Sequence, residues 1–368
     1  MKILYVIHGL PVGGAETLVV NYLIRLKQLG HEVGLVELRR VDTFLRDKLI
    51  ENSIPVFSLM NELGLKEIII NKWYPIYWIS RLNRIIKSFS PAVVHYHTRF
   101  EKMDKISFPA NRSFLTFHAR LDRLVNKKNF SVETLAILSN GGMTFVGISS
   151  TVCADIERMI PGAKIEIIPN GLDIQGIRKT YYDRNDLMRE TNIPQDSYII
   201  GQVGRFNKVK NHLFTIGLMP ELLKKSPKCN LVFIGTGDEE EVRTLKEEAA
   251  RLHVENHIVF LGQREDATAL MTALDAIILP SFSESFSLVL VEAQAKGIRC
   301  VASDNVPEDV ICNNNCFRLS LDAPKQQWAD FLLGKTTRES CSDIMKFDIE
   351  KVIDRHISMY KGCNCLKN

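Results

Sequence analysis

Residues 276–297 read AIILPSFSESFSLVLVEAQAKG. A short apolar run is followed by a loop of small and polar residues and then by an apolar segment at helical spacing. The stretch therefore predicts a buried strand, a turn and a helix that starts near Phe286. A strand that leads into a helix is the repeating unit of a parallel sheet with helices on its faces. Ligands bind such sheets beside the carboxyl ends of the strands, which is where this loop is expected.

The same unit recurs along the chain in two series. The first series of predicted strands comprises residues 3–7, 32–38, 92–97, 114–118, 145–149 and 164–170. The second series comprises residues 198–205, 230–237, 257–262, 276–281 and 299–303. Because helical stretches separate the strands, the sequence predicts an α/β protein with two Rossmann-like, doubly wound domains.

Two domains also agree with the length, because 368 residues exceed the usual size of a single core. A polar segment lies between the two series and contains no run long enough for a buried strand. We predict an N-terminal domain over 1–172, a linker over 173–195, a C-terminal domain over 196–345 and a final helical segment over 346–368.

The composition narrows the class of protein. Charged residues make up 24%, hydrophobic residues 45%, and the net charge is +4, which favours a folded protein and does not point to a nucleic-acid partner. No secretion signal and no membrane-spanning run are recognised, and the eight cysteines are scattered, so we expect reduced thiols in the cytoplasm. Cys312 and Cys316 lack a second ligand pair at zinc spacing, and no metal site is expected.

Two cations follow the first predicted strand of the second series. Gly204, Arg205 and Lys210 lie in the sequence GRFNKVKNH, just before a predicted helix. Gly204 lets the backbone approach a ligand, and the two cations can stabilise a diphosphate that gains negative charge as it departs. The alternative is a pair of solvated surface cations, and this loop alone does not decide between the two interpretations.

Residues 276–297 contain two carboxylates. Glu284 lies in the loop, and Glu292 is expected about two turns into the helix. The free N–H groups at the helix start, over Phe286, Ser287 and Leu288, suit a phosphate. A carboxylate beside such an anion site needs partners of its own, and sugar hydroxyls are suitable ones. The alternative is a helix cap at Glu284 and a surface charge at Glu292.

Four motifs together resemble the retaining glycosyltransferases of family four, which have the two-domain GT-B fold. The motifs are HGLPVGGAE (8–16), IIPNGLD (167–173), GRF..VKNH (204–212) and the Glu-(seven residues)-Glu segment (284–292). The resemblance implies two domains facing a cleft, with a C-terminal helix that returns to the N-terminal domain. It also implies a nucleotide-diphosphate sugar as substrate, with a UDP-sugar expected, and no cofactor.

The resemblance assigns roles to residues of the C-terminal domain. Arg205 and Lys210 would bind the donor diphosphate in place of a metal, Glu292 would bind the ribose, and Glu284 would contact the transferred sugar. The family commonly has glycine where this chain has Ser285, so the choice of donor sugar is open. The segment at Gln263 and Arg264 would hold the base through its backbone.

The resemblance also extends to the N-terminal domain. Gly13 and Gly14 resemble the glycine loop that closes over the donor phosphates, although such a pair is also found in ordinary tight turns. His118 matches the histidine that lines the sugar site, the alternative being a buried or capping histidine. His95 and His97 are two more histidines at a strand end and are expected to line the cleft.

The region 67–90 admits two interpretations. Basic residues alternate there with Trp and Tyr, which suits a peripheral contact with an anionic membrane that carries a lipid-linked acceptor. The alternative is an ordinary covering helix with Trp78, Leu82 and Ile85 packed inward. A membrane contact would place the protein at the inner face of the plasma membrane.

The sequence thus predicts a metal-independent, retaining transfer of a hexose or N-acetylhexosamine to a glycan or lipid-linked acceptor, in surface polysaccharide biosynthesis. One rival is a nucleotide-sugar epimerase or phosphorylase on the same fold. The other is a catalytically silent nucleotide-sugar-binding subunit, against which the complete set of Arg205, Lys210, Glu284 and Glu292 argues.

Overall fold

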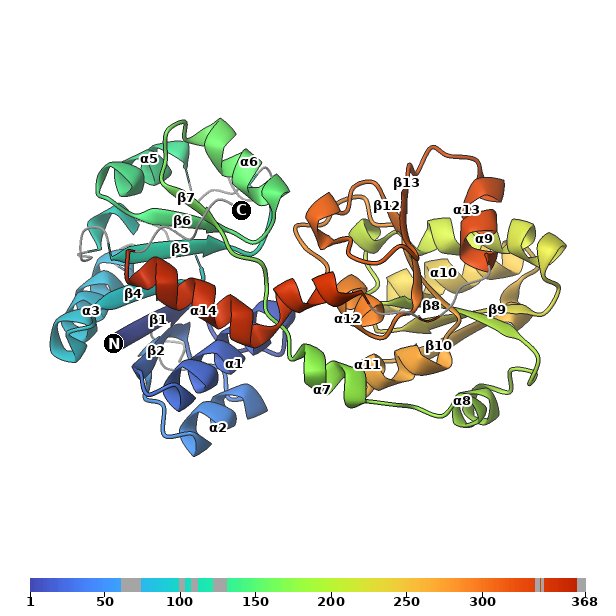
Figure 1. The fold of residues 1–368 in the computed structure, drawn as a ribbon, viewed down its shortest axis with the longest axis horizontal. Coiled ribbons are helices and arrows are strands. Elements are labelled where there is room, and N and C mark those ends of the chain that lie inside the picture. Colours follow the sequence, from blue (N-terminus) through green and yellow to red (C-terminus); the bar gives the residue numbers. More distant parts are fainter. Residues whose placement is uncertain are drawn as a thin grey trace. The chain divides into compact units, whose positions relative to one another are not determined.

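The computed structural model describes residues 1–60, 74–98, 103–106, 112–121, 131–334, 338 and 341–362. The chain divides into two compact units. Unit 1 comprises Met1–Gly171 and Ile349–Asn368, and unit 2 comprises Leu172–Asp348. Both units consist of a parallel sheet with helices, so the predicted fold class is confirmed (Figure 1).

Unit 1 has a seven-stranded parallel sheet in the order β3-β2-β1-β4-β5-β6-β7. The order reverses at β1, which makes the sheet doubly wound. Its strands are β1 Lys2–Ile7, β2 Glu32–Arg39, β3 Val56–Met60, β4 Val93–Tyr96, β5 Ser113–Phe117, β6 Thr144–Gly147 and β7 Ile165–Ile167. Its helices are α1 Gly14–Gln28, α2 Phe44–Glu51, α3 Tyr74–Phe89, α5 Val132–Asn140, α6 Ser150–Met159 and α14 Ile349–Tyr360.

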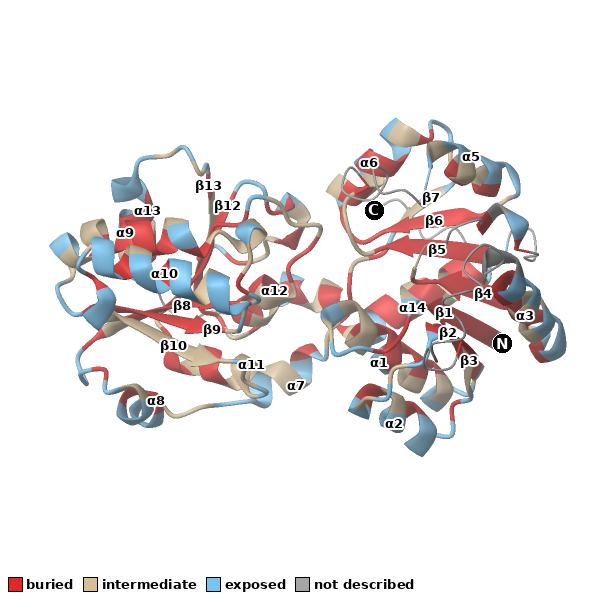
Figure 2. Ribbon diagram, turned by 180° about the vertical axis from the view of Figure 1, so that it is seen from behind, coloured by how far each residue is buried: buried red, intermediate tan, exposed pale blue. Residues whose placement is uncertain are grey.

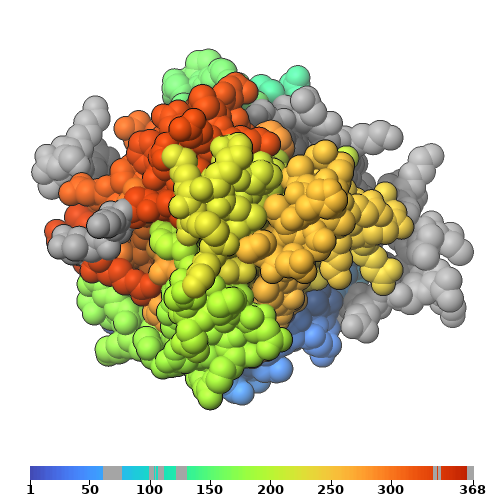
Figure 3. Space-filling view, turned by 90° about the vertical axis from the view of Figure 1, so that its right-hand side faces the viewer, coloured from blue at the N-terminus to red at the C-terminus, as the bar shows by residue number. Residues whose placement is uncertain are grey.

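Unit 2 has a six-stranded parallel sheet in the order β10-β9-β8-β11-β12-β13. Its strands are β8 Tyr198–Val203, β9 Cys229–Ile234, β10 Ile258–Gly262, β11 Ala276–Leu279, β12 Arg299–Ser303 and β13 Cys316–Leu319. Its helices are α7 Ile174–Lys179, α8 Arg184–Thr191, α9 His212–Lys225, α10 Glu239–Arg251, α11 Ala267–Leu270, α12 Leu288–Ala295 and α13 Lys325–Leu333. Helices α9 and α10 lie side by side on the face drawn in Figure 3 (yellow and gold).

The cores follow from the apolar runs of the sequence. Most strand residues of both sheets are buried, whereas the helices expose their outer sides (Figure 2). Two strands, β3 and β13, were not predicted from the sequence. Both lie at an edge of their sheet, and each is a short apolar run interrupted by a polar residue, Ser58 in β3 and Arg318 in β13.

The structure assigns the predicted linker and the C-terminal helix each to one unit. Residues 173–195, expected as a linker, contain α7 and α8 and belong to unit 2. The C-terminal helix α14 belongs to unit 1 and packs beside α1, where Arg25 Nη2 lies 2.5 Å from Glu350 Oε2 (Figure 1). The side chain of Tyr360, the last residue of α14, reaches the buried hydroxyl of Tyr5 at 2.9 Å.

The region proposed to contact a membrane is partly described. Residues 67–73 lie outside the described residues, and α3 begins at Tyr74. Trp78 and Leu82 are buried, whereas Ile85 is half-buried, so the described part of α3 packs inward as the covering-helix interpretation predicts. Among the described residues, no helix has the length and hydropathy to cross a membrane.

Gly235, which follows β9, tests how tightly the loops of unit 2 pack. Its φ is +149°, and a Cβ there would lie 2.0 Å from the carbonyl oxygen of Gly204. Gly235→Ala should destabilise unit 2 by about 3 kcal/mol or more, because backbone strain and overpacking add. Urea unfolding measures the loss. In the control Gly262→Ala, φ is +72° with nothing within 4 Å, so only a strain of about 1–2 kcal/mol is expected. Equal losses in the two variants would contradict this account.

Candidate functional site

The loop after β8 brings two cations to the carboxyl edge of the sheet in unit 2. Gly204 has a φ of +144°, and the Lys210 side chain passes over it, with Cε 3.6 Å from where a Cβ would be. The Asn207 side chain accepts a hydrogen bond from the Lys210 main-chain N–H at 3.0 Å, which holds the turn. Arg205 is exposed and has no hydrogen bond or ion pair with the described part of the chain.

Lys210 forms an ion pair with Glu284, which follows the neighbouring strand β11. Lys210 Nζ lies 2.7 Å from Glu284 Oε1, and the side chains are only 23% and 12% exposed. The two loops are also joined through the backbone, since Phe282 N–H donates to the Val209 carbonyl at 2.9 Å. An ammonium group has three donors, so Lys210 can hold Glu284 and still donate to an anion.

The helix after Glu284 begins later than predicted. We expected the start near Phe286, but α12 begins at Leu288. Ser287 is extended and caps the helix, and its hydroxyl accepts from Leu290 N–H at 3.3 Å. Phe286 is instead buried against Phe347, at 5.3 Å between ring centroids, because its apolar ring belongs to the core. The N–H groups of Leu288 and its successor precede the first intrahelical bond and remain suited to a phosphate.

Glu292 lies one turn into α12 and not two, because the helix starts at Leu288. Burial raises the pKa of its carboxyl group to about 7, while the Lys296 ammonium and the Thr268 hydroxyl oppose the rise in that pKa. Lys296 is itself held by the Ile177 and Thr180 carbonyl groups, at 2.8 and 2.7 Å. Glu292 is therefore a half-buried carboxylate with room for further hydrogen-bond donors. It is not the exposed surface charge that the alternative interpretation predicts.

Gln263 and Arg264 follow β10 directly. Gln263 is exposed, whereas the Arg264 guanidinium binds carboxylates on both sides: Nη1 lies 2.5 Å from Glu190 Oε1, and Nε lies 2.8 Å from Asp266 Oδ1. These hydrogen bonds raise the pKa of Arg264. The side chain of Arg264 is thus committed within unit 2. Ser285 is half-buried next to Glu284.

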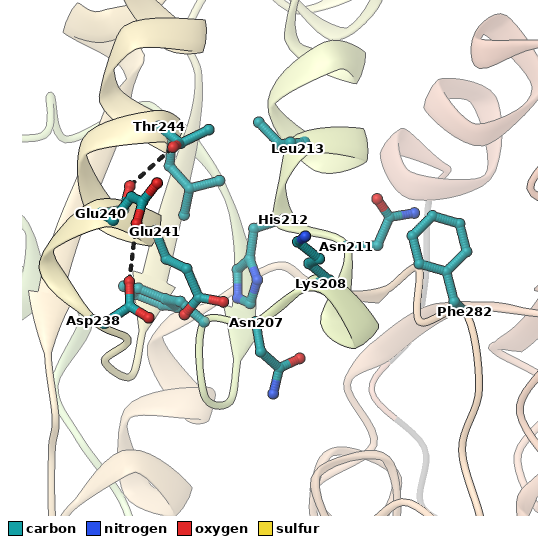
Figure 4. A pocket seen from close by; sticks show the side chains of 12 residues that line it. Asn207, Lys208, Asn211, His212, Leu213, Asp238, Glu240, Glu241, Thr244 and Phe282 are labelled. Atoms are coloured by element: carbon teal, nitrogen blue, oxygen red, sulfur yellow. Dashed lines mark hydrogen bonds between the residues drawn. The ribbon is translucent and has the colours of Figure 1, made fainter. Parts of the chain in front are cut away.

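A cavity of about 560 Å³ lies on another side of the same loop, between the starts of α9 and α10 (Figure 4). Asp238, Glu240 and Glu241 line it together with the buried ring of His212. Its carboxylates repel a diphosphate, and none of the predicted donor-binding side chains lines it. The side chains predicted to bind the donor thus lie outside this cavity.

The candidate residues of unit 1 occupy two strand ends. Gly13 is the extended residue before α1, and Gly14 is the first residue of that helix. Glu16 lies in the first helical turn and folds back, so that a Cβ on Gly13 would be 2.3 Å from its Oε2. His118 follows β5, which ends at Phe117 and not at His118 as predicted.

His118 does not stand alone. It contacts His97, with His97 Nδ1 3.1 Å from His118 Nε2, and burial lowers the pKa of His118 to about 4. His95, expected to line a cleft, is instead fully buried, and Tyr360 and Thr116 satisfy its ring nitrogens. Tyr360 was not predicted to belong to this group of side chains. The sequence around Tyr360 has apolar residues at helical spacing. This spacing indicates that the helix packs against the protein, but not which residues it contacts.

The structure also bears on metal binding. Among the residues that the structure describes, no three His, Cys, Asp or Glu side chains gather closely enough to hold a metal ion. Cys312 and Cys316 are both free thiols in unit 2, and burial raises the pKa of Cys312 to about 12.

Comparisons with known proteins agree with this arrangement. The family profile described as "Glycosyltransferase Family 4" matches residues 12–175, and that described as "Glycosyl transferases group 1" matches residues 183–330. EpsF of Bacillus subtilis strain 168, named as a glycosyltransferase, is 25% identical over 389 residues, covering 98% of this chain and 96% of EpsF.

Two further proteins extend the comparison. The UDP-Gal:alpha-D-GlcNAc-diphosphoundecaprenol alpha-1,3-galactosyltransferase of Escherichia coli is 28% identical over 162 residues, which are 44% of this chain and 40% of that enzyme. The crystal structure of HepE from Anabaena with UDP has a TM-score of 0.76 at 18% identity, covering 98% of this chain and 100% of HepE, and this likeness concerns the fold. The chain therefore belongs to glycosyltransferase family four and is a glycosyltransferase with the GT-B fold.

Proposed function

We propose that the protein is a metal-independent, retaining glycosyltransferase. It moves a hexose or N-acetylhexosamine from a UDP-sugar to a glycan or lipid-linked acceptor in surface polysaccharide biosynthesis. The observation that carries the proposal is the Lys210–Glu284 pair beside the start of α12, because it combines a cation, a carboxylate and free N–H groups at one sheet edge. HepE binds UDP, and the E. coli relative is named for a UDP-Gal donor, which supports the choice of UDP.

Side chains take the place of a metal in this reaction. The bond between the anomeric carbon and the phosphate oxygen breaks, and the diphosphate gains negative charge. Arg205 is free to bind that charge, and Lys210 can bind it while still holding Glu284. The first N–H groups of α12, beyond the Ser287 cap, add a third set of donors. No cofactor takes part.

Glu284 is held in place by Lys210 and is proposed to face the transferred sugar. Its carboxylate would stabilise the positive charge of an oxocarbenium-like transition state. The acceptor hydroxyl then forms the new bond on the face from which the diphosphate departs, and a phosphate oxygen takes its proton. Analysis of the product's anomeric configuration by NMR tests retention, and an inverted product would exclude this mechanism.

The remaining candidate residues are proposed to bind the nucleotide and to select the donor sugar. Glu292 accepts hydrogen bonds from the ribose hydroxyls, and the backbone at Gln263 and Arg264 holds the base. Ser285 lies next to Glu284, so its side chain is placed to restrict the sugar pocket. In unit 1, the turn at Gly13 and Gly14 is proposed to cover the phosphates, and His118 is proposed to contact the sugar.

The rival interpretations lose support. The matched families and the relatives named above are glycosyltransferases, whereas no observation favours an epimerase, a phosphorylase or a silent binding subunit. Incubating the donor without acceptor would reveal an epimer, and adding phosphate would reveal a sugar phosphate, if either rival held.

Lys210→Ala tests the diphosphate site. The variant should lose about a hundredfold to a thousandfold in kcat, because one preorganised donor to the leaving group disappears. UDP release measures turnover, with the UDP-sugar chosen from a nucleotide-sugar panel by thermal shift. Lys208→Ala is the matched control, since this exposed lysine lies in the same loop and has no ion pair with the described residues. Unchanged turnover in Lys210→Ala, or an equal loss in Lys208→Ala, would refute the assignment.

The raised pKa of Glu292 leads to a test with pH. The carboxyl group is about half protonated near pH 7, and ribose hydroxyls bind best to its ionised form. Donor binding should therefore lower this pKa and release a proton, and affinity should weaken about tenfold from pH 8 to pH 6. Calorimetry with UDP-glucose in buffers of different ionisation enthalpy measures the release, because its phosphates do not titrate in this range. Glu292→Gln should abolish both effects. If the proton release persists in that variant, another group is responsible.

Peripheral membrane contact at the cytoplasmic face is part of the proposal, through the outer side of α3. Arg84 and Lys87 are exposed there and Tyr77 is 62% exposed, whereas Arg81 donates to the Leu59 carbonyl at 3.0 Å. Flotation with vesicles containing anionic lipid should recover the protein, and the combined Arg84→Gln and Lys87→Gln variant should bind less, since each cation near the surface contributes about 1 kcal/mol. Absence of binding, or binding that ignores these charges, would remove the membrane from the proposal.

A further inference from the structure

We propose that His97 is a positioning residue for His118, and that it does so as part of a buried histidine stack anchored by the C-terminal helix. This inference rests on the function proposed above, in which His118 contacts the transferred sugar. It assigns a role to His97 and to Tyr360, neither of which needs to touch the substrate.

The sheet of unit 1 brings the two histidines together. His97 follows β4 and His118 follows β5, and these strands are parallel neighbours. His97 Nδ1 lies 3.1 Å from His118 Nε2, which is hydrogen-bonding distance. The two rings are nearly parallel, with 5.4 Å between centroids and 26° between planes, so the hydrogen bond joins them edge to edge. His97 is only 7% exposed, so water does not compete freely for this bond.

Burial keeps this pair of rings uncharged. It lowers the pKa of His118 to about 4, and burial with the neighbouring His95 and His118 lowers that of His97 well below its usual value. Between two neutral imidazoles, one of the facing nitrogens carries the proton and the other accepts it. The tautomer of His118 is thus tied to that of His97. Nδ1 of His118 has no partner among the described residues, so this choice decides whether it donates or accepts.

His97 is in turn held on both sides. Its ring lies 4.2 Å from that of His95 at 30°, and 4.6 Å from that of Tyr5 at 44°, measured between centroids. His95 cannot rotate freely, since Nδ1 lies 2.6 Å from the Tyr360 hydroxyl and Nε2 lies 2.7 Å from Thr116 Oγ1. The Tyr360 hydroxyl is also 2.9 Å from that of Tyr5.

The histidine stack therefore runs from Tyr360 through His95 and His97 to His118. Each ring is fixed by packing or by hydrogen bonds before a substrate arrives. A side chain oriented in advance does not have to reorganise during the reaction, which is the advantage of such a supporting shell. The last turn of α14 thus belongs to the support of the reaction site, although it lies far from His118 in the sequence.

His97→Phe removes the hydrogen bond and keeps an aromatic ring in the stack. We expect kcat for UDP release to fall by about tenfold to a hundredfold, because His118 is no longer held in one orientation, with the donor KM changed less than about threefold. His97→Asn should recover most of the activity, since its amide can donate or accept near the place of Nδ1. If His97→Phe retains full kcat, or if Asn does not recover what Phe loses, His97 has no positioning role.

Two further comparisons separate positioning from loss of structure. In a His118→Ala background, His97→Phe should have no additional effect on kcat, because it acts only through His118; additive losses would overturn the proposal. His257→Phe is the control, since it removes a half-buried imidazole and its hydrogen bond to the Cys229 carbonyl in unit 2 without contacting any ring of the histidine stack. It should leave kcat unchanged.

Ring ¹⁵N shifts provide a readout that does not depend on activity. In the protein labelled at histidine, His118 should appear as a single neutral tautomer near pH 7, and His97→Phe should convert it to a mixture. An unchanged His118 signal in that variant would refute the inference, even if the variant were too unstable to assay. If His118→Ala itself keeps full kcat, then the proposed role of His118 fails. A loss in His118→Ala without a loss in His97→Phe contradicts only the inference about His97.

Discussion

The parallel pairing of β8 with β11 is the constraint on which the candidate site of unit 2 depends. The strands are far apart in the sequence, yet Ile200 pairs with Ala276, so both strands end at the same edge. The loop after each strand supplies one member of the Lys210–Glu284 pair, and a backbone hydrogen bond between Phe282 and Val209 joins the loops. A cation, a carboxylate and the start of a helix meet there because hydrogen bonding of the sheet puts them there.

The acidic side chains of unit 2 differ in how far they are buried and in whether a cation lies beside them. Glu284 has a cation within 2.7 Å and is compensated before any ligand arrives. Glu292 is desolvated and only partly compensated by Lys296, so the pKa of its carboxyl group rises to about 7. The carboxylates around the cavity between α9 and α10 have neither arrangement, and Asp238 simply caps α10. Similar residues thus differ in chemistry because their desolvation and their partners differ.

In unit 1 the candidate residues belong to a buried cluster of aromatic rings. His95 and His97 are buried and neutral, and contacts between rings, rather than charges, hold them. The C-terminal helix completes this cluster with Tyr360, so unit 1 depends on a segment that follows all of unit 2 in the sequence. The chain crosses between the units twice, and each unit is assembled around its own parallel sheet.

The sequence by itself determined the fold class and most of the strands, because continuous apolar runs followed by helical segments have few other solutions. It also singled out Arg205, Lys210 and Glu284, because charged residues that follow buried strands stand out locally, whereas the expected roles of these residues and of Glu292 came from the resemblance to the family. The edge strands β3 and β13 escaped prediction because their apolar runs are short and are interrupted by Ser58 and Arg318. Only the tertiary structure decided that α12 starts at its Ser287 cap, that Glu292 loses its solvent, and that Tyr360 reaches His95, because each depends on contacts between residues distant in the chain.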